Sequence, residues 1–120
     1  MMAEEAAFDE RKWARWWRLQ GAEELSQILF WRWDPIGVAD DLPYTRGEYD
    51  SYTEPIVLKL KAGATSREIG DYLAEIEMLQ MEVRSARKRR GRAAELLVQW
   101  YAASMDWWAE FGPYQGQGDE

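Results

Sequence analysis

The stretch Trp33-Asp-Pro-Ile-Gly-Val-Ala-Asp-Asp-Leu-Pro-Tyr-Thr-Arg-Gly-Glu-Tyr-Asp50 decides the fold of the chain. It contains Pro35, Gly37, Pro43 and Gly47, and prolines and glycines at this density interrupt a regular helix. Helical patterns lead into the stretch and out of it, and hardly any segment shows the alternation of a strand. We therefore expect a long irregular loop over residues 34–50, laid across a compact all-α bundle of four to five helices.

The segment before this loop begins with a tryptophan-rich helix, expected over residues 4–19. Its acids come early and its bases late, which matches the helix dipole. Residues at helical spacing share one face: Trp13, Trp16, Trp17 and Gln20. We interpret this face as core, and the alternative is a partner-binding face, because Trp and Arg are enriched at interface hot spots. Gly21 is expected to end the helix.

Two further helices flank the loop. A helix from about Ala22 to Trp33 ends at Asp34, because the residue before a proline is pushed out of the helical region. Its expected core face is Leu25, Ile28, Leu29 and Trp33. After the loop, a helix covers residues 51–62 and stops at Gly63. Its N-terminal cap is either Ser51, paired with Glu54, or Thr53.

The fourth helix has the clearest local pattern, beginning with a capping box from Thr65 to Glu68. The expected core face repeats at helical spacing: Ile69, Tyr72, Leu73, Ile76, Leu79 and Val83. Gly70 on this helix is expected to permit close packing of a neighbouring helix. Another face carries four acids, here called the acidic stripe: Glu68, Asp71, Glu75 and Glu82.

A cluster of bases follows, here called the basic run: Arg84, Arg87, Lys88, Arg89, Arg90 and Arg92. We expect it to form an exposed connection before a last helix over residues 92–111. The apolar side of that helix is expected to contain Leu97, Trp100, Tyr101, Ser104, Trp107, Trp108 and Phe111. Residues 112–120 are polar and rich in glycine, and we expect this tail to be flexible.

Composition excludes several kinds of chemistry. The 120 residues are the size of a single domain, and a hydrophobic share of 47% suffices for a core. The chain has no cysteine and no histidine, so it has no thiolate nucleophile, no imidazole base and no Cys/His zinc site. The net charge of −7 disfavours nucleic acid and anionic membranes as partners and favours a basic protein. We expect no cofactor and no metal.

The location is expected to be cytoplasmic. The first residues carry several charges, including Glu4, Glu5, Asp9, Arg11 and Lys12, which do not resemble a secretory signal. No apolar run approaches the roughly 20 residues that a membrane span needs. The sequence does not indicate an oligomeric state.

A series of short motifs follows in order from the loop to the fourth predicted helix: Trp33-Asp34-Pro35-Ile36-Gly37-Val38, Glu48-Tyr49-Asp50-Ser51-Tyr52, Leu60, Gly63-Ala64, Glu68-Ile69, Tyr72-Leu73, Ile76-Glu77 and Met81. Through these motifs, residues 27–83 resemble the YugE-like family of small, uncharacterised bacterial proteins. The resemblance implies a compact all-helical fold and a bacterial or phage source. Such domains also occur near contact-dependent toxin systems, which suggests an immunity role. The resemblance implies no activity and no catalytic residue.

The chain departs from that family at both ends and in the loop. Residues 40–46 lengthen the loop, and residues 1–26 and 84–111 form tryptophan-rich helical extensions around the family-like core. Six of the eight tryptophans lie in these extensions. A tryptophan stripe left in water would form an apolar patch too large for a normal monomer. We therefore expect the two extensions to pack on each other or on the core.

The aromatic residues of the motif have two interpretations. Trp33, Tyr49 and Tyr52 are expected to be core residues with polar tips that reach backbone groups, and the alternative is an aromatic recognition pocket. With Asp34, Pro35, Gly37 and Asp50 they form the structural part of the motif.

The carboxylates of the loop also have two interpretations: Asp34, Asp40, Asp41, Glu48 and Asp50. In the first interpretation they form a hydrolytic acid/base pair or a divalent-cation site. In the second they are turn residues in a solvated loop. Their spacing is not that of a calcium-binding loop, which disfavours the cation site. We do not expect an enzyme, and a carboxylate-dependent hydrolase is kept as the less favoured alternative.

The favoured function is a non-enzymatic, acidic protein-binding module, in its sharpest form a bacterial toxin-immunity or inhibitor protein. Its expected partner-binding residues are Asp40, Asp41, Glu68, Asp71, Glu75 and Glu82. The partner would be a protein with a basic surface, such as a toxin. The other alternative is an RNA-binding protein that uses the basic run over residues 84–92. Residues 27–83 contain 11 acids and 5 bases, which favours a protein partner over RNA.

Overall fold

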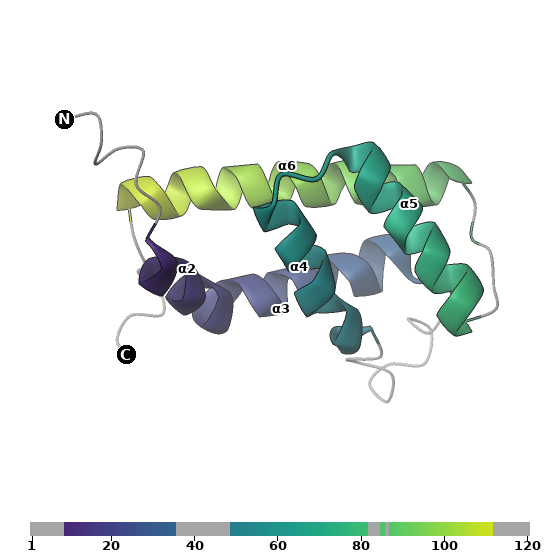
Figure 1. Cartoon of the computed structure of the whole chain (residues 1–120), viewed down its shortest axis with the longest axis horizontal. Coiled ribbons are helices and arrows are strands. Elements are labelled where there is room, and N and C mark those ends of the chain that lie inside the picture. Colours follow the sequence, from purple (N-terminus) through teal and green to yellow (C-terminus); the bar gives the residue numbers. More distant parts are fainter. Residues whose placement is uncertain (1–8, 36–48, 82–84, 86, 112–120) are drawn as a thin grey trace.

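The computed structural model describes residues 9–35, 49–81, 85 and 87–111 (Figure 1). These residues form helices and turns, and no strand occurs among them, which confirms the predicted all-α fold. Most of the predicted loop, including Gly37, Asp40, Asp41 and Glu48, lies outside the described residues, as does the predicted tail.

The first two predicted helices are one continuous helix. It comprises α2 (Glu10–Trp16), the π-helical turn η1 (Trp17–Gly21), α3 (Ala22–Ile28) and the π-helical turn η2 (Leu29–Trp33). Asp9 caps its start, because the carboxylate accepts hydrogen bonds from the backbone N–H groups of Arg11 and Lys12. The predicted start at residue 4 lies outside the described residues.

The prediction that Gly21 ends a helix is wrong. Gly21 has helical dihedral angles (φ −62°, ψ −43°) and is buried within the continuous helix. A Cβ atom at this position would lie 2.7 Å from Cη2 of Trp16. The glycine therefore makes room for the buried Trp16 indole and does not interrupt the backbone.

The long helix ends where the sequence predicts. Asp34 adopts a left-handed conformation (φ 35°), which aspartate tolerates better than most residues. Its N–H group donates a hydrogen bond to the carbonyl oxygen of Leu29 at 2.9 Å. The chain therefore leaves the helix directly before Pro35.

The helix after the loop starts with a short 3-10 turn, η4 (Asp50–Tyr52), followed by α4 (Thr53–Lys61). Neither predicted side-chain cap is present: Tyr52 occupies the cap position, and the Thr53 hydroxyl donates to the carbonyl oxygen of Asp50 instead. The predicted stop at Gly63 is confirmed, with φ +92° and the backbone hydrogen bonds of a glycine-terminated helix.

The fourth predicted helix consists of α5 (Ser66–Ile76) and the π-helical turn η5 (Glu77–Met81). The predicted capping box of Thr65 and Glu68 is present. Ile69, Leu73 and Ile76 are buried as predicted. Leu79, which was predicted to be core, is 69% exposed, and Val83 lies outside the described residues.

The last helix, α6 (Arg87–Phe111), starts earlier than predicted. Most of the basic run is therefore helical and does not connect two helices as predicted, although Arg87, Lys88, Arg89 and Arg92 are exposed as expected. Gly70 of α5 faces this helix, and a Cβ atom there would lie 3.7 Å from Cβ of Ala94. Since that is an ordinary contact distance, the close approach does not require a glycine.

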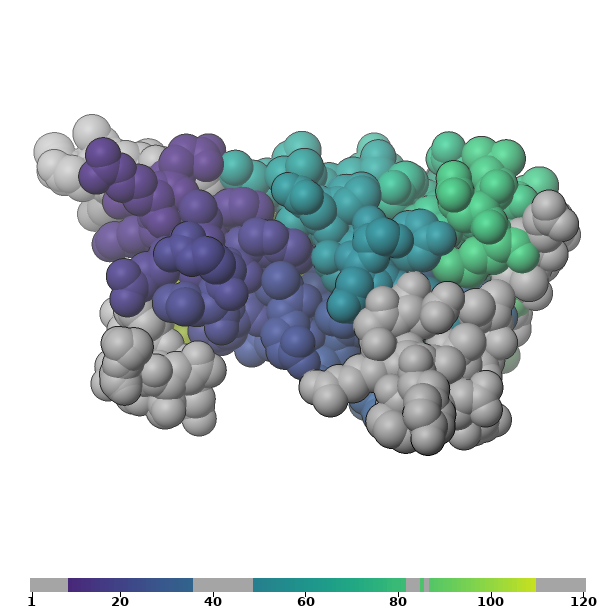
Figure 2. Space-filling view, turned by 90° about the horizontal axis from the view of Figure 1, so that it is seen from below, coloured from purple at the N-terminus to yellow at the C-terminus, as the bar shows by residue number. Residues whose placement is uncertain are grey.

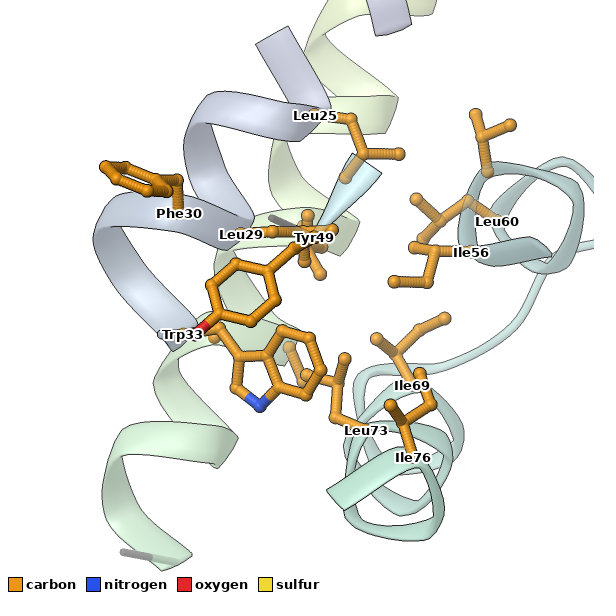
Figure 3. Packing of buried hydrophobic residues seen from close by; sticks show 14 of the residues in the cluster. Leu25, Leu29, Phe30, Trp33, Tyr49, Ile56, Leu60, Ile69, Leu73 and Ile76 are labelled. Carbon is orange, nitrogen blue, oxygen red and sulfur yellow. The ribbon is translucent and has the colours of Figure 1, made fainter. Parts of the chain in front are cut away.

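The helices form two layers around one core. The continuous helix of residues 10–33 and α6 lie along the long direction of the molecule, and α4 and α5 pack against them (Figure 1). Figure 3 shows Trp33 and Tyr49 next to each other in this core, facing the aliphatic side chains of α5. Tyr49 and Trp33 have ring centroids 5.4 Å apart.

The tryptophan-rich extensions pack on each other, as expected. Trp16 is completely buried, with its ring centroid 5.6 Å from that of Trp100 and 5.8 Å from that of Tyr101. Trp13 Nε1 donates a hydrogen bond to the Tyr101 hydroxyl at 2.9 Å. Trp107 was predicted on the apolar side of α6, but it is 48% exposed.

Candidate functional site

A buried carboxylate, Glu77, joins three segments of the chain. It is 1% exposed and accepts hydrogen bonds from Trp33 Nε1 at 2.8 Å and from Ser85 Oγ at 2.6 Å. Its other oxygen accepts from the backbone N–H of Ser85 at 2.8 Å and from Arg90 Nη1 at 3.2 Å. Burial alone would raise the pKa of Glu77, but the bonds from Ser85 and Trp33 and the charge of Arg90 hold that pKa below its usual value.

This saturated arrangement indicates a structural role for Glu77. Each oxygen of the carboxylate already accepts two hydrogen bonds, so neither is directed toward a ligand. In the sequence, Glu77 stands out only as one of the motif residues. Its position directly after the core residue Ile76 and before a cluster of arginines is the sequence signal that could have predicted a buried ion pair.

The motif around Trp33 is also structural. Tyr49 donates a hydrogen bond to Oδ1 of the buried Asp34 at 2.7 Å. Tyr52 is half-buried with its ring at right angles to that of Trp33. These contacts support the interpretation of Trp33 and Tyr49 as core residues, but their polar tips reach the carboxylates of Glu77 and Asp34 and not the predicted backbone groups.

The loop carboxylates of the described residues have separate partners. Asp34 accepts from Tyr49, whereas Asp50 is exposed and accepts from the hydroxyl of Ser26 on α3. Asp40, Asp41 and Glu48 lie outside the described residues. Among the residues that the structure does describe, no group of three or more acidic side chains could hold a metal ion.

The described residues of the acidic stripe lie on the outer side of α5. Glu68, Asp71 and Glu75 are exposed, whereas Glu82 is outside the described residues. Glu68 takes part in the capping box, so Asp71 and Glu75 are the carboxylates most available to a partner. Figure 2 shows α4 and α5, in teal to green, side by side on one face of the molecule.

Two exposed apolar residues continue this surface. Met78 is 57% exposed and Leu79 is 69% exposed. Asp71 and Glu75 on α5 and Leu79 on η5 are all exposed along the same helix. Helical spacing in the sequence predicts the acids of this surface but not its apolar end.

The basic run divides into two parts. Arg90 is turned inward to Glu77, with 16% of its side chain exposed. In the described part of the chain, the carboxylate that pairs with Arg90 is Glu77, which is not part of the acidic stripe. Lys88, Arg89 and Arg92 point outward into a groove.

This feature, here called the basic groove, lies between α6 and η2 and has a volume of about 790 Å³. Its lining residues are Trp31, Arg32, Lys88, Arg89, Arg92, Ala93, Glu95, Leu96 and Gln99. Four bases and one exposed indole therefore gather at a concave surface of an otherwise acidic chain. The bases of α6 are evident in the sequence, but their association with Trp31 and Arg32 is not.

Comparison with known proteins gives no relative from which a role can be transferred. The chain matches no family model, no curated protein and no solved structure. The resemblance of residues 27–83 to the YugE-like family therefore stays a prediction. Within the described part of the chain, no helix combines the length and the apolar character needed to cross a membrane.

Proposed function

We propose that this chain is a non-enzymatic protein-binding module and that the outer side of α5 and η5 is its binding surface. The observation that supports this proposal best is the exposure of Leu79. Leu79 is 69% exposed at a position with core spacing and lies next to the exposed Met78, and adjoining exposed apolar side chains mark interaction surfaces. Its neighbour Met78 is of a type enriched at interfaces.

The packing of α5 fixes the orientation of this surface. Ile69, Leu73 and Ile76 are buried on the inner side of α5, so the opposite side must face outward. Asp71 and Glu75 then stand beside the apolar end formed by Met78 and Leu79. An apolar centre bordered by charges of one sign suits a partner with an apolar patch bordered by bases.

The proposed partner is a basic protein, and a toxin or nuclease inhibited by the chain is the sharpest form of the proposal. Carboxylates on the surface would steer such a partner and raise the association rate at low salt. The apolar end would then slow dissociation, because most differences in affinity reside in the dissociation rate. A bacterial cytoplasm is the proposed setting.

Photo-crosslinking can test the proposal in the cells that make the chain. A photoreactive amino acid at Met78 should capture a basic protein, and the same amino acid at Leu19 should not. Leu19 is a matched control, because it is also an exposed apolar residue but lies on η1. Capture of the same proteins from both positions would contradict the proposal.

A further inference from the structure

We propose that the basic groove is a second binding site, which takes an acidic segment of a partner protein that carries one apolar side chain. The groove receives its cations from two helices far apart in sequence. Arg32 comes from η2, whereas Lys88, Arg89 and Arg92 come from the first turns of α6. This site is distinct from the α5 surface and does not depend on the function proposed for it.

The cations of the groove lack carboxylate partners among the residues that the structure describes. All four are exposed, and none forms an ion pair with a carboxylate in the described part of the chain. Glu95 is the one acid among the lining residues. The groove therefore concentrates positive charge on a chain whose net charge is −7, and an anionic segment complements it.

Trp31 supplies the apolar part of the site. Its indole is 52% exposed, and its ring stands edge-on against the buried ring of Phe30, with centroids 5.0 Å apart. This contact holds the indole in place, so binding costs little side-chain entropy. An exposed tryptophan beside arginines has the composition of an interface hot spot.

The same features favour a peptide over a nucleic acid. Single-stranded nucleic acid is bound on successive aromatic side chains along a basic track, and Trp31 is the aromatic residue among those lining the groove. A polyanion that extended past the groove would also meet an acidic chain. A short acidic segment with one apolar residue places its charges on the four bases and its apolar side chain on Trp31.

Fluorescence anisotropy with the full chain can test this assignment. The probe is a labelled peptide of about twelve residues, built from Asp and Glu around one central Leu. We expect it to bind, and the matched peptide with Asn and Gln in place of the acids to bind at least about tenfold more weakly. A labelled oligouridine of similar length is the comparison probe, and we expect it to bind more weakly than the acidic peptide.

Variants of the chain then locate the site. Arg32→Glu combined with Arg92→Glu, and separately Trp31→Ala, should each weaken binding of the acidic peptide by about tenfold or more. Arg15→Glu combined with Arg18→Glu makes the same change in net charge at the α2 end of the molecule, and it should leave binding within about twofold. Helical circular dichroism spectra confirm that each variant folds.

Three outcomes would overturn the proposal. Tighter binding of the oligouridine would assign the groove to RNA. Equal losses in the groove variants and the α2 variant would mean that the peptide responds only to net charge. Absence of binding by the acidic peptide at low salt would show that the groove does not take such a segment.

Discussion

Trp33 Nε1 lies 2.8 Å from Oε2 of Glu77, in a buried hydrogen bond between residues 44 positions apart. The same carboxylate accepts bonds from Ser85 and Arg90. One residue therefore connects the end of the first long helix, the end of α5 and the beginning of α6. These are the elements that position both the α5 surface and the basic groove.

We predict that Glu77→Gln lowers the free energy of unfolding by about 2–4 kcal/mol, because it leaves the largely buried Arg90 without its counter-charge. Urea unfolding followed by circular dichroism measures the change. Glu75→Gln is the control, since it makes the same chemical change on an exposed carboxylate and should stay within about 0.5 kcal/mol of the parent chain. Equal effects of the two substitutions would contradict the role of Glu77.

The lowered pKa of Glu77 also predicts a dependence of stability on pH. A carboxyl group with a lower pKa in the folded state stabilises the fold fully above its unfolded pKa. That contribution is lost as the pH falls through the folded pKa. Stability should therefore decline on acidification below the usual glutamate range, and Glu77→Gln should reduce the slope. An unchanged slope in that variant would assign the acid sensitivity to other groups.

Gly21 and Gly91 provide a matched pair of glycine-to-alanine substitutions within helices. Gly21→Ala should destabilise the chain despite the better helix propensity of alanine, because its Cβ would lie 2.7 Å from the Trp16 ring. Gly91→Ala meets no atom within 4 Å and should stabilise by about 0.5–1 kcal/mol. Thermal unfolding midpoints that shift in the same direction for both variants would refute this difference.

Trp16 and Trp107 in the two extensions should differ in how much each stabilises the fold, because one is buried and the other is exposed. Trp16→Ala removes a completely buried side chain and should cost about 3–5 kcal/mol. Trp107→Ala, at a 48% exposed position, should cost less than about 1 kcal/mol. Chemical denaturation of the two variants compares them, and a cost at Trp107 as large as that at Trp16 would contradict the burial pattern.

Local sequence signals correctly predicted two features of the helix ends. The capping box of Thr65 and Glu68 and the helix end at Gly63 involve only residues near one another in sequence, so their patterns suffice. Gly21 was misinterpreted because a helix-ending glycine and a glycine that accommodates an indole look alike in sequence. Only the packing of Trp16 distinguishes them.

The sequence predicted only part of the α5 surface, because local spacing does not show where the helix geometry changes. Helical spacing placed Asp71 and Glu75 outward correctly, but its extension to Leu79 failed. The π-helical turn after Ile76 adds a residue per turn, which changes the direction of the side chains that follow. Glu77 consequently faces inward and Leu79 outward. The basic groove needs Trp31 beside residues of α6, and no local pattern predicts such a contact.

The proposed function depends most directly on the α5 surface, and association kinetics with the crosslinked partner test that surface. We predict that Asp71→Lys combined with Glu75→Lys slows association about tenfold or more at low salt, and that Leu79→Ala speeds dissociation. The control Glu54→Lys combined with Asp106→Lys reverses two other exposed acids and should change association far less. Unchanged association and dissociation rates in the α5 variants, with their helical spectra intact, would contradict the proposal.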